Sequence, residues 1–349
     1  MTDCAILSPS HPFTLSPCHR PARFTFYDFR PTLRLGMEFS LEAFPQATLT
    51  AGAVLLYAGG RTAAAALAQN APSPGRRALG HWLPIAAIAS IAAASGQVNF
   101  ALAIIFATSV ASLGLVGGCI AVMGPNADEP ELWPSPARKS ASILLPATVL
   151  VFIAGFAATI TLLASILMLA MGALILFLRL DPADRAGESN PPKTKPFTLL
   201  IAVAISCLGA WAAVTGSVGI NATMDFSSPI PVVATVLSPL LVASMLLGGS
   251  TLASRGAAWV ASATNVGVAQ LNLCLLLPLL ALAWRARHDH ALYYPMPTWR
   301  VDAVTLMVLA AALLPSAAGR WRPGRIEGVT LLAIYVAYVL ANIVVSVMV

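Results

Sequence analysis

Charge is scarce in this sequence, and its scarcity excludes a soluble globular protein. Only 10% of the 349 residues are charged, 58% are hydrophobic, and the mean hydropathy is +0.80. Soluble proteins carry about a quarter charged residues. The few charges lie in short clusters between apolar stretches long enough to cross a bilayer. Alternating strand patterns of about ten residues are lacking, which argues against a transmembrane barrel. The sequence therefore predicts an all-α, polytopic membrane protein.

Cysteine pairs and catalytic motifs are lacking as well. The five cysteines form no C-x-x-C pair, so neither a disulfide framework nor a zinc site is indicated. There is no H-E-x-x-H motif, no phosphate-binding glycine loop and no motif-placed Ser-His-Asp set. We expect no enzymatic activity and no cofactor. The net charge of +6 indicates membrane topology rather than nucleic-acid binding, because the basic residues border apolar stretches. The lipid bilayer is the expected partner, and the sequence identifies no protein partner.

Residues 1–36 differ from the rest of the chain. The stretch SPSHPFTLSPCHRPARFTFYDFRPTLRLG has scattered Pro, His and Arg but no continuous apolar core and no helical period. It does not match a signal peptide. Two interpretations remain open: residues 1–36 are a disordered tail, or the natural start is Met37, from which MEFSLEAFPQATL leads into the first apolar stretch.

Apolar length predicts ten transmembrane helices in two groups of five. The first group lies at about 42–60, 79–95, 98–123, 140–161 and 163–179, and the second at about 197–220, 229–252, 257–284, 301–318 and 326–348. The fourth and fifth stretches nearly touch, so nine or eleven helices remain alternatives. The expected organisation is a first five-helix repeat over 37–180, a charged cytoplasmic linker over 181–196 and a second repeat over 197–349.

The basic residues indicate how the two groups are oriented. With an external N-terminus, thirteen Lys and Arg residues that border the helices lie on the inner side, and only Arg285, Arg287 and Arg300 lie on the outer side. This bias follows the positive-inside rule. An odd number of helices per group inverts the second group relative to the first, as in many secondary transporters. The sequence thus predicts two inverted repeats, and the lack of a sorting signal favours a bacterial inner membrane.

Two stretches resemble motifs of the sodium/calcium exchanger family of cation antiporters. RIEGVTLLAIYVAYVL (Arg325 to Leu340) is similar to the start of that family's last helix, in which a basic residue, a Glu-Gly step and a Y-x-x-Y pair are common. ASATNVGVAQLNLCLLLPLLAL (Ala261 to Leu282) is similar to its Gly-Ser-Asn-x-x-Asn helix, with Asn272 at the second asparagine. The resemblance implies the exchanger fold from about Glu42 to the C-terminus.

The first half offers ATSVASLGLVGG (Ala107 to Gly118) as the counterpart of the second stretch. One register pairs Asn272 with Ser112 and brings Gly118 and Pro278 to a shared bend. A shared V-A-x-L-x-L pattern gives another register, which pairs Asn272 with Gly114. The first register is preferred because of the shared bend.

The sequence departs from the family pattern at its acidic motifs. Family members carry a glutamate in the second and seventh helices that binds the ion, but LGHWLPIAAIASIAAASG and PIPVVATVLSPLLVASMLLGGST contain no acid. The acids nearest to the predicted helices are Glu42, Asp225, Asp302 and Glu327. Ca²⁺ prefers six to eight oxygen ligands that include carboxylates, so a monovalent cation fits the remaining neutral oxygens better than a divalent one.

The candidate ligands are polar residues expected at mid-membrane depth. We select Asn272, Asn265, Gln270, Ser109, Ser112 and Ser238. An amide deep in a helix can instead form a structural hydrogen bond between helices, and Ser often bonds back to its own helix. The predicted function is antiport of a monovalent or divalent cation by alternating access. The alternatives are a degenerate membrane subunit that does not transport, and a transporter of a neutral solute.

Overall fold

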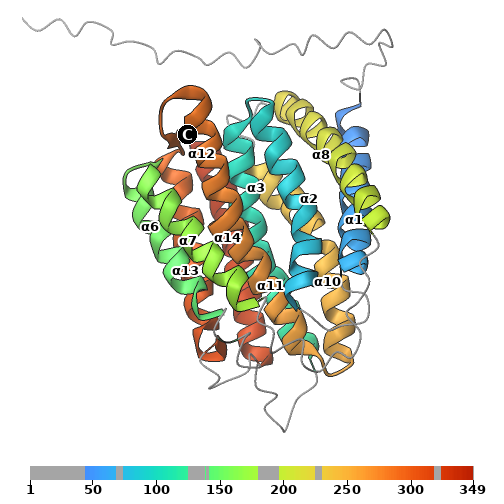
Figure 1. Ribbon diagram of the computed structural model, residues 1–349. Helices are drawn as coiled ribbons and strands as arrows, with labels where there is room; N and C mark the ends of the chain where they lie inside the picture. Colours follow the sequence, from blue (N-terminus) through green and yellow to red (C-terminus); the bar gives the residue numbers. More distant parts are fainter. Residues whose placement is uncertain are drawn as a thin grey trace, which may run out of the picture. The chain divides into compact units, whose positions relative to one another are not determined.

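The computed structural model describes residues 44–67, 74–124, 138, 141–179, 196–224, 230–317 and 324–348. These ranges contain ten continuous helical units, three of which include a π-helical turn (Figure 1). The first five units are α1 (Pro45–Leu67), α2 (Pro74–Ala94), α3–η2–α4 (Val98–Val110, Ala111–Val116, Gly117–Met123), α6 (Leu144–Phe156) and α7 (Leu162–Arg179). The other five are α8 (Pro196–Met224), α9–η4–α10 (Ile230–Val232, Val233–Leu237, Ser238–Ser254), α11–η5–α12 (Ala258–Leu271, Asn272–Leu276, Leu277–His288), α13 (Met296–Ala317) and α14 (Arg325–Met348). The predicted number of ten helices is confirmed. The expectations for residues 1–36, for Met37 and for nearly all of the linker lie outside the described residues.

The helices pair reciprocally between the two halves. The first helices of the halves, α1 and α8, pack along each other, and so do the fourth, α6 and α13. The third helix of each half meets the fifth helix of the other: α4 packs on α14, and α12 packs on α7. Such reciprocity is expected when two five-helix repeats are related by a two-fold axis, and the odd helix number makes them inverted. The fold is therefore an all-α polytopic membrane fold of two inverted five-helix repeats.

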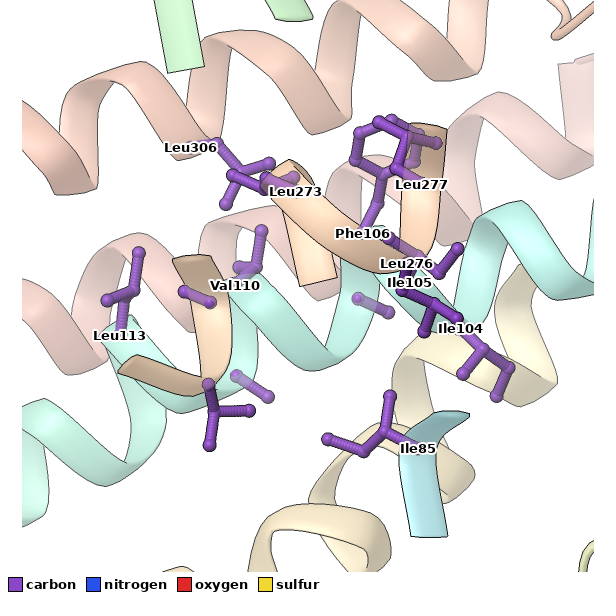
Figure 2. Packing of buried hydrophobic residues seen from close by; sticks show 14 of the residues in the cluster. Ile85, Ile104, Ile105, Phe106, Val110, Leu113, Leu273, Leu276, Leu277 and Leu306 are labelled. Atoms are coloured by element: carbon purple, nitrogen blue, oxygen red, sulfur yellow. The ribbon is translucent and has the colours of Figure 1, made fainter. Parts of the chain in front are cut away.

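The two most enclosed helices are the third of each half. In the most apolar windows of α3–η2–α4 and α11–η5–α12, 89% and 78% of the residues are buried by protein, against 28–50% in the other five candidate spans. Every side chain from Phe100 to Val110 is buried. Figure 2 shows this packing: Ile104, Ile105 and Phe106 of α3 lie beside Leu273, Leu276 and Leu277 of the second half. These helices are apolar because they face other helices, and polar side chains on them are shielded from both lipid and water.

Seven helices in the described ranges are long and apolar enough to cross a membrane, and α6 and α7 are shorter apolar helices. The helix predicted at 140–161 is shorter in the structure, where α6 ends at Phe156. The chain reverses at Ala158, whose φ is +51°. The following strand β1 (Thr159–Ile160) then pairs antiparallel with β2 (Leu292–Tyr293). This small sheet separates the fourth and fifth helices, which the sequence left almost fused.

A close approach between α6 and α13 makes Gly155 sensitive to substitution. A Cβ added at Gly155 would overlap the indole ring of Trp299, which is 2% exposed. We expect Gly155→Ala to destabilise the protein by about 1–3 kcal/mol, the usual cost of overpacking a core. Gly248→Ala is the matched control, because a Cβ there has nothing within 4 Å. The control should be neutral or slightly stabilising, since Ala exceeds Gly in helix propensity by about 0.5–1 kcal/mol. Thermal unfolding in detergent measures both, and equal melting temperatures would contradict the packing argument.

Candidate functional site

Three helices near the centre are interrupted by π-helical turns in equivalent ways. The amide N–H of Gly117 donates to the Ser112 carbonyl, that of Ser238 to Val233, and that of Leu277 to Asn272, each reaching five residues back. Such turns widen a helix locally and often occur at functional sites. The segments η2 and η5 end at Val116 and Leu276, 160 residues apart (276 − 116). That spacing is the register that pairs Ser112 with Asn272 and Gly118 with Pro278.

Prolines explain two of the interruptions. Pro239 and Pro278 come directly after Ser238 and Leu277 and have no amide hydrogen to give to the preceding turn. The carbonyl of Ala234, five residues before Pro239, accepts hydrogen bonds from the hydroxyls of Ser238 (3.0 Å) and Tyr335 (3.4 Å). Near Pro278, the carbonyl of Cys274 lies against Gly172 of α7, where a Cβ would come within 2.6 Å of it. The interruptions are therefore held by contacts with other helices.

Asn272, at the start of η5, links the two halves. Its side-chain nitrogen donates to the hydroxyl oxygens of Thr108 (3.0 Å) and Ser109 (3.1 Å) in α3, and it lies 3.5 Å from the Ile105 carbonyl. The side chains of Asn272, Thr108 and Ser109 are fully buried, each with 0% exposure. Polar side chains from the third helix of each repeat thus form a neutral cluster at the centre of the fold.

The hydroxyl hydrogens fix the orientation of this amide. Thr108 donates its hydrogen to the Ile104 carbonyl (2.6 Å), and Ser109 donates to the Ile105 carbonyl (2.7 Å). Each hydroxyl has only one hydrogen, so both offer only lone pairs to Asn272. The NH₂ group must face them, and Oδ1 must face away. That oxygen is buried, and no group among the described residues donates a hydrogen bond to it, so it can accept one from a donor or bind a cation.

The other predicted ligands are buried but are not all brought together by hydrogen bonds. Ser112 donates to the Ser109 carbonyl (2.9 Å), which places it next to the Asn272 cluster. Ser238 is bonded within its own helix. Gln270 and Asn265 are buried in α11, and the side-chain nitrogen of Asn265 has no hydrogen-bond partner within the described part of the chain. The sequence analysis did not select Thr108 as a ligand, although its position one residue before Ser109 was the available signal.

The central helices contain no carboxylate. Neither α2 nor any of the three π-containing helices has an Asp or Glu residue. Within the described ranges, no group of three His, Cys, Asp or Glu side chains is arranged to hold a metal ion. The candidate site therefore consists of neutral oxygens only.

Asp302 lies near the start of its helix and is buried. It lies in α13 and is only 1% exposed. Glu327 accepts a hydrogen bond from the Gly324 amide at the start of α14 (2.7 Å), where a negative charge stabilises the helix N-terminus. Glu42 and Asp225 lie outside the described residues.

Two inverted repeats with interrupted helices at their interface are the arrangement found in many secondary transporters. A family model described as sodium/calcium exchanger protein matches residues 195–344, which is nearly all of the second repeat. The second repeat is thus similar to this family, although the second and seventh helices of the chain contain no acidic residue. The family comprises transporters and not enzymes.

Solved structures show the same fold at low sequence identity. A structure of native YfkE is 16% identical, with a TM-score of 0.64 over 87% of this chain and 92% of that chain. The H⁺/Ca²⁺ exchanger CAX is 13% identical, with a TM-score of 0.67 over 87% and 85%. The sodium-calcium exchanger NCX_Mj, soaked with zero Na⁺ and Ca²⁺, is 17% identical, with a TM-score of 0.59 over 86% and 99%. No significant match was found among curated protein sequences.

Proposed function

We propose that this protein is a cation antiporter that works by alternating access between its two repeats, with a monovalent cation bound by neutral oxygens around Asn272. The observation that carries the proposal is the Oδ1 atom of Asn272, a buried acceptor without a donor. Leaving a buried polar atom unpaired costs about 1–3 kcal/mol. A bound cation recovers that cost whenever it occupies the site.

The charge of the site favours a single positive charge. A divalent ion enclosed by neutral groups would keep two uncompensated charges in a medium of low dielectric, which is far more costly than one. Hydroxyl oxygens, an amide oxygen and carbonyls of interrupted helices are ligands that transporters use for Na⁺. Asn272, Ser109 and Ser112 provide such atoms from both repeats, and Ser238, Gln270 and Asn265 are further candidates on the neighbouring turns.

The comparisons support a cation as the substrate. The matched family is that of sodium/calcium exchangers, and the similar structures include exchangers named for Na⁺, Ca²⁺ and H⁺. We infer that the repeats over 37–180 and 197–349, joined by a charged cytoplasmic linker over 181–196, move against each other in the inner membrane of a bacterial cell.

The test is the thermal stability of the purified full chain in detergent with NaCl, KCl, CaCl₂ or MgCl₂, and with choline chloride as the ionic-strength control. One monovalent cation should raise the stability, by about 2.7 kcal/mol at a hundred times its dissociation constant. Asn272→Ala should lose this response and Ser109→Ala should weaken it. Ser165→Ala is the matched control, because Ser165 of α7 is 1% exposed and its hydroxyl donates to the Thr161 carbonyl, which directly precedes that helix.

A folded wild-type protein that responds equally to all salts would overturn the proposal. Stable co-purification with one membrane protein would then favour a subunit that does not transport. Uptake of a neutral solute without any ion response would favour a neutral-solute carrier instead.

A further inference from the structure

Asp302 lies in a closed cluster with two tyrosines. Its Oδ2 accepts a hydrogen bond from the Tyr294 hydroxyl (2.9 Å), and its Oδ1 accepts one from the Tyr338 hydroxyl (2.9 Å). Tyr294 and Tyr338 are 0% and 2% exposed. Tyr294 precedes α13, Asp302 lies in its second turn, and Tyr338 belongs to α14. Asp302 is the one buried carboxyl among the described residues.

No cation in the described ranges faces this carboxyl. The elements packed on α13 are α3, η2, α6 and α14. The first three have no charged residue, and α14 has only Arg325 and Glu327. Those two lie 13 and 11 residues before Tyr338, roughly 16–20 Å along the helix axis at 1.5 Å per residue. Arg300 of α13 is exposed, as are His288, Asp289 and His290 of the preceding loop.

The cluster can exist in two protonation states with the same heavy-atom positions. When Asp302 is ionised, both tyrosines donate to it and partly offset its charge. When Asp302 gains a proton, its Oδ1–H donates to the Tyr338 oxygen, whose own hydrogen rotates away, while Tyr294 still donates to Oδ2. Burial and the neighbouring Asp302 carboxyl raise the pKa of Tyr294 well above its usual value, so this tyrosine keeps its hydrogen in both states. The only covalent change is the O–H bond formed at Asp302.

Aromatic contacts place this cluster beside α3. The rings of Tyr294 and Phe106 are stacked with centroids 5.6 Å apart, and Trp299 meets Phe106 edge-on at 5.7 Å. Phe106 follows Ile105, whose carbonyl lies next to the Asn272 amide. The helix α3, whose Thr108 and Ser109 accept hydrogen bonds from Asn272, is therefore in direct contact with the carboxyl cluster.

We propose that Asp302, held by Tyr294 and Tyr338, is a proton-binding site separate from the cation site at Asn272. A buried carboxylate without a cation partner is costly in a membrane protein and is generally neutralised or functional. The hydroxyl hydrogens of both tyrosines point to the carboxyl oxygens, which suits a proton rather than a metal cation. The proton site stands on its own geometry. The role of the bound proton as the coupling ion rests on the proposed antiport.

The first experiment measures the proton directly. Infrared difference spectra of the purified full chain, recorded in H₂O and D₂O, detect the carbonyl band of a protonated carboxyl. Exposed carboxyls with pKa values near 4 are ionised at pH 6. We expect a band that persists at pH 6, disappears as the pH is raised further and is missing in Asp302→Asn. Tyr338→Phe keeps the carboxyl but removes one hydrogen bond, so it should keep the band at a shifted frequency.

No such band at any pH at which the protein stays folded would mean that Asp302 is permanently ionised, and a band unchanged at all pH values would mean that it is permanently neutral. Either result overturns the proton site. A second experiment tests the coupling: a cation gradient applied to proteoliposomes should move protons in the wild type but not in Asp302→Asn. The cation-specific thermal stabilisation should survive in Asp302→Asn, since Asn272 is intact. Cation-driven proton movement that persists in Asp302→Asn overturns the coupling, whereas loss of the cation response in the wild type counts against the proposed antiport alone.

Discussion

Asn272→Asp should give the candidate site a response to Ca²⁺ that the wild type lacks. The substitution keeps the size of the side chain and adds one negative charge next to the oxygens of Thr108 and Ser109. Two unit charges 4 Å apart attract each other by about 4 kcal/mol at an effective dielectric constant of 20, and a divalent ion gains twice that before desolvation is subtracted. We expect the apparent affinity for Ca²⁺ to rise at least about tenfold, which corresponds to about 1.4 kcal/mol.

Without a cation, the same variant should be less stable than the wild type. The new carboxylate has no hydrogens for Thr108 and Ser109, whose own hydrogens are committed to carbonyls of α3. Asn342→Asp is the matched control, because Asn342 is also buried, with 1% exposure, but lies in α14 and is not one of the candidate ligands. The melting temperatures of both variants, measured at increasing CaCl₂ concentration, test whether Ca²⁺ stabilises Asn272→Asp more than the control. Equal responses, or none in Asn272→Asp, would place the cation elsewhere.

The helices could be predicted from the sequence because lipid imposes a simple requirement. Each crossing segment needs about twenty apolar residues, and the clusters of charge mark where segments end. The exception is the end of α6, where the sequence remains apolar through Ala157–Ile160. A reversal of the chain there depends on Ala158 in a left-handed conformation and on the pairing of β1 with β2. Neither feature has a hydropathy signal.

The candidate site could be predicted only in part. Asn272 stands out in the sequence as an amide within an apolar helix, but its partners lie more than 160 residues away in α3. The orientation of its amide follows from hydrogens that Thr108 and Ser109 give to their own helix, which requires coordinates. Asp302 could be recognised in the sequence only as one of the acids nearest to the predicted helices, and its burial could not be predicted. The structure buries it because Tyr294 and Trp299 fold back over the start of α13.

Phe106→Ala should be among the most destabilising single changes. Phe106 of α3 packs on the Asp302 cluster, and it directly follows Ile105, whose carbonyl lies next to Asn272. Its side chain is fully buried, contacts Tyr294 and Trp299, and is labelled in Figure 2. Phe→Ala substitutions in soluble cores cost about 3–5 kcal/mol. In a membrane protein, lipid is as apolar as the core, so the part of this cost that comes from transfer of the side chain out of water is reduced. The part that comes from the cavity left behind remains. We expect a loss on the order of 2–3 kcal/mol in the free energy of unfolding.

Phe177→Ala provides the control, because Phe177 lies in α7 and is 75% exposed at the surface of the fold. Its ring has no core to leave empty, so the melting temperature should hardly change. Because Phe106 supports the ring of Tyr294, Phe106→Ala should also alter the infrared band of Asp302, which Phe177→Ala should leave as in the wild type. A Phe106→Ala protein with wild-type stability and an unchanged band would mean that α3 and the carboxyl cluster are mechanically independent. Ion binding at Asn272 and protonation at Asp302 would then need another physical connection.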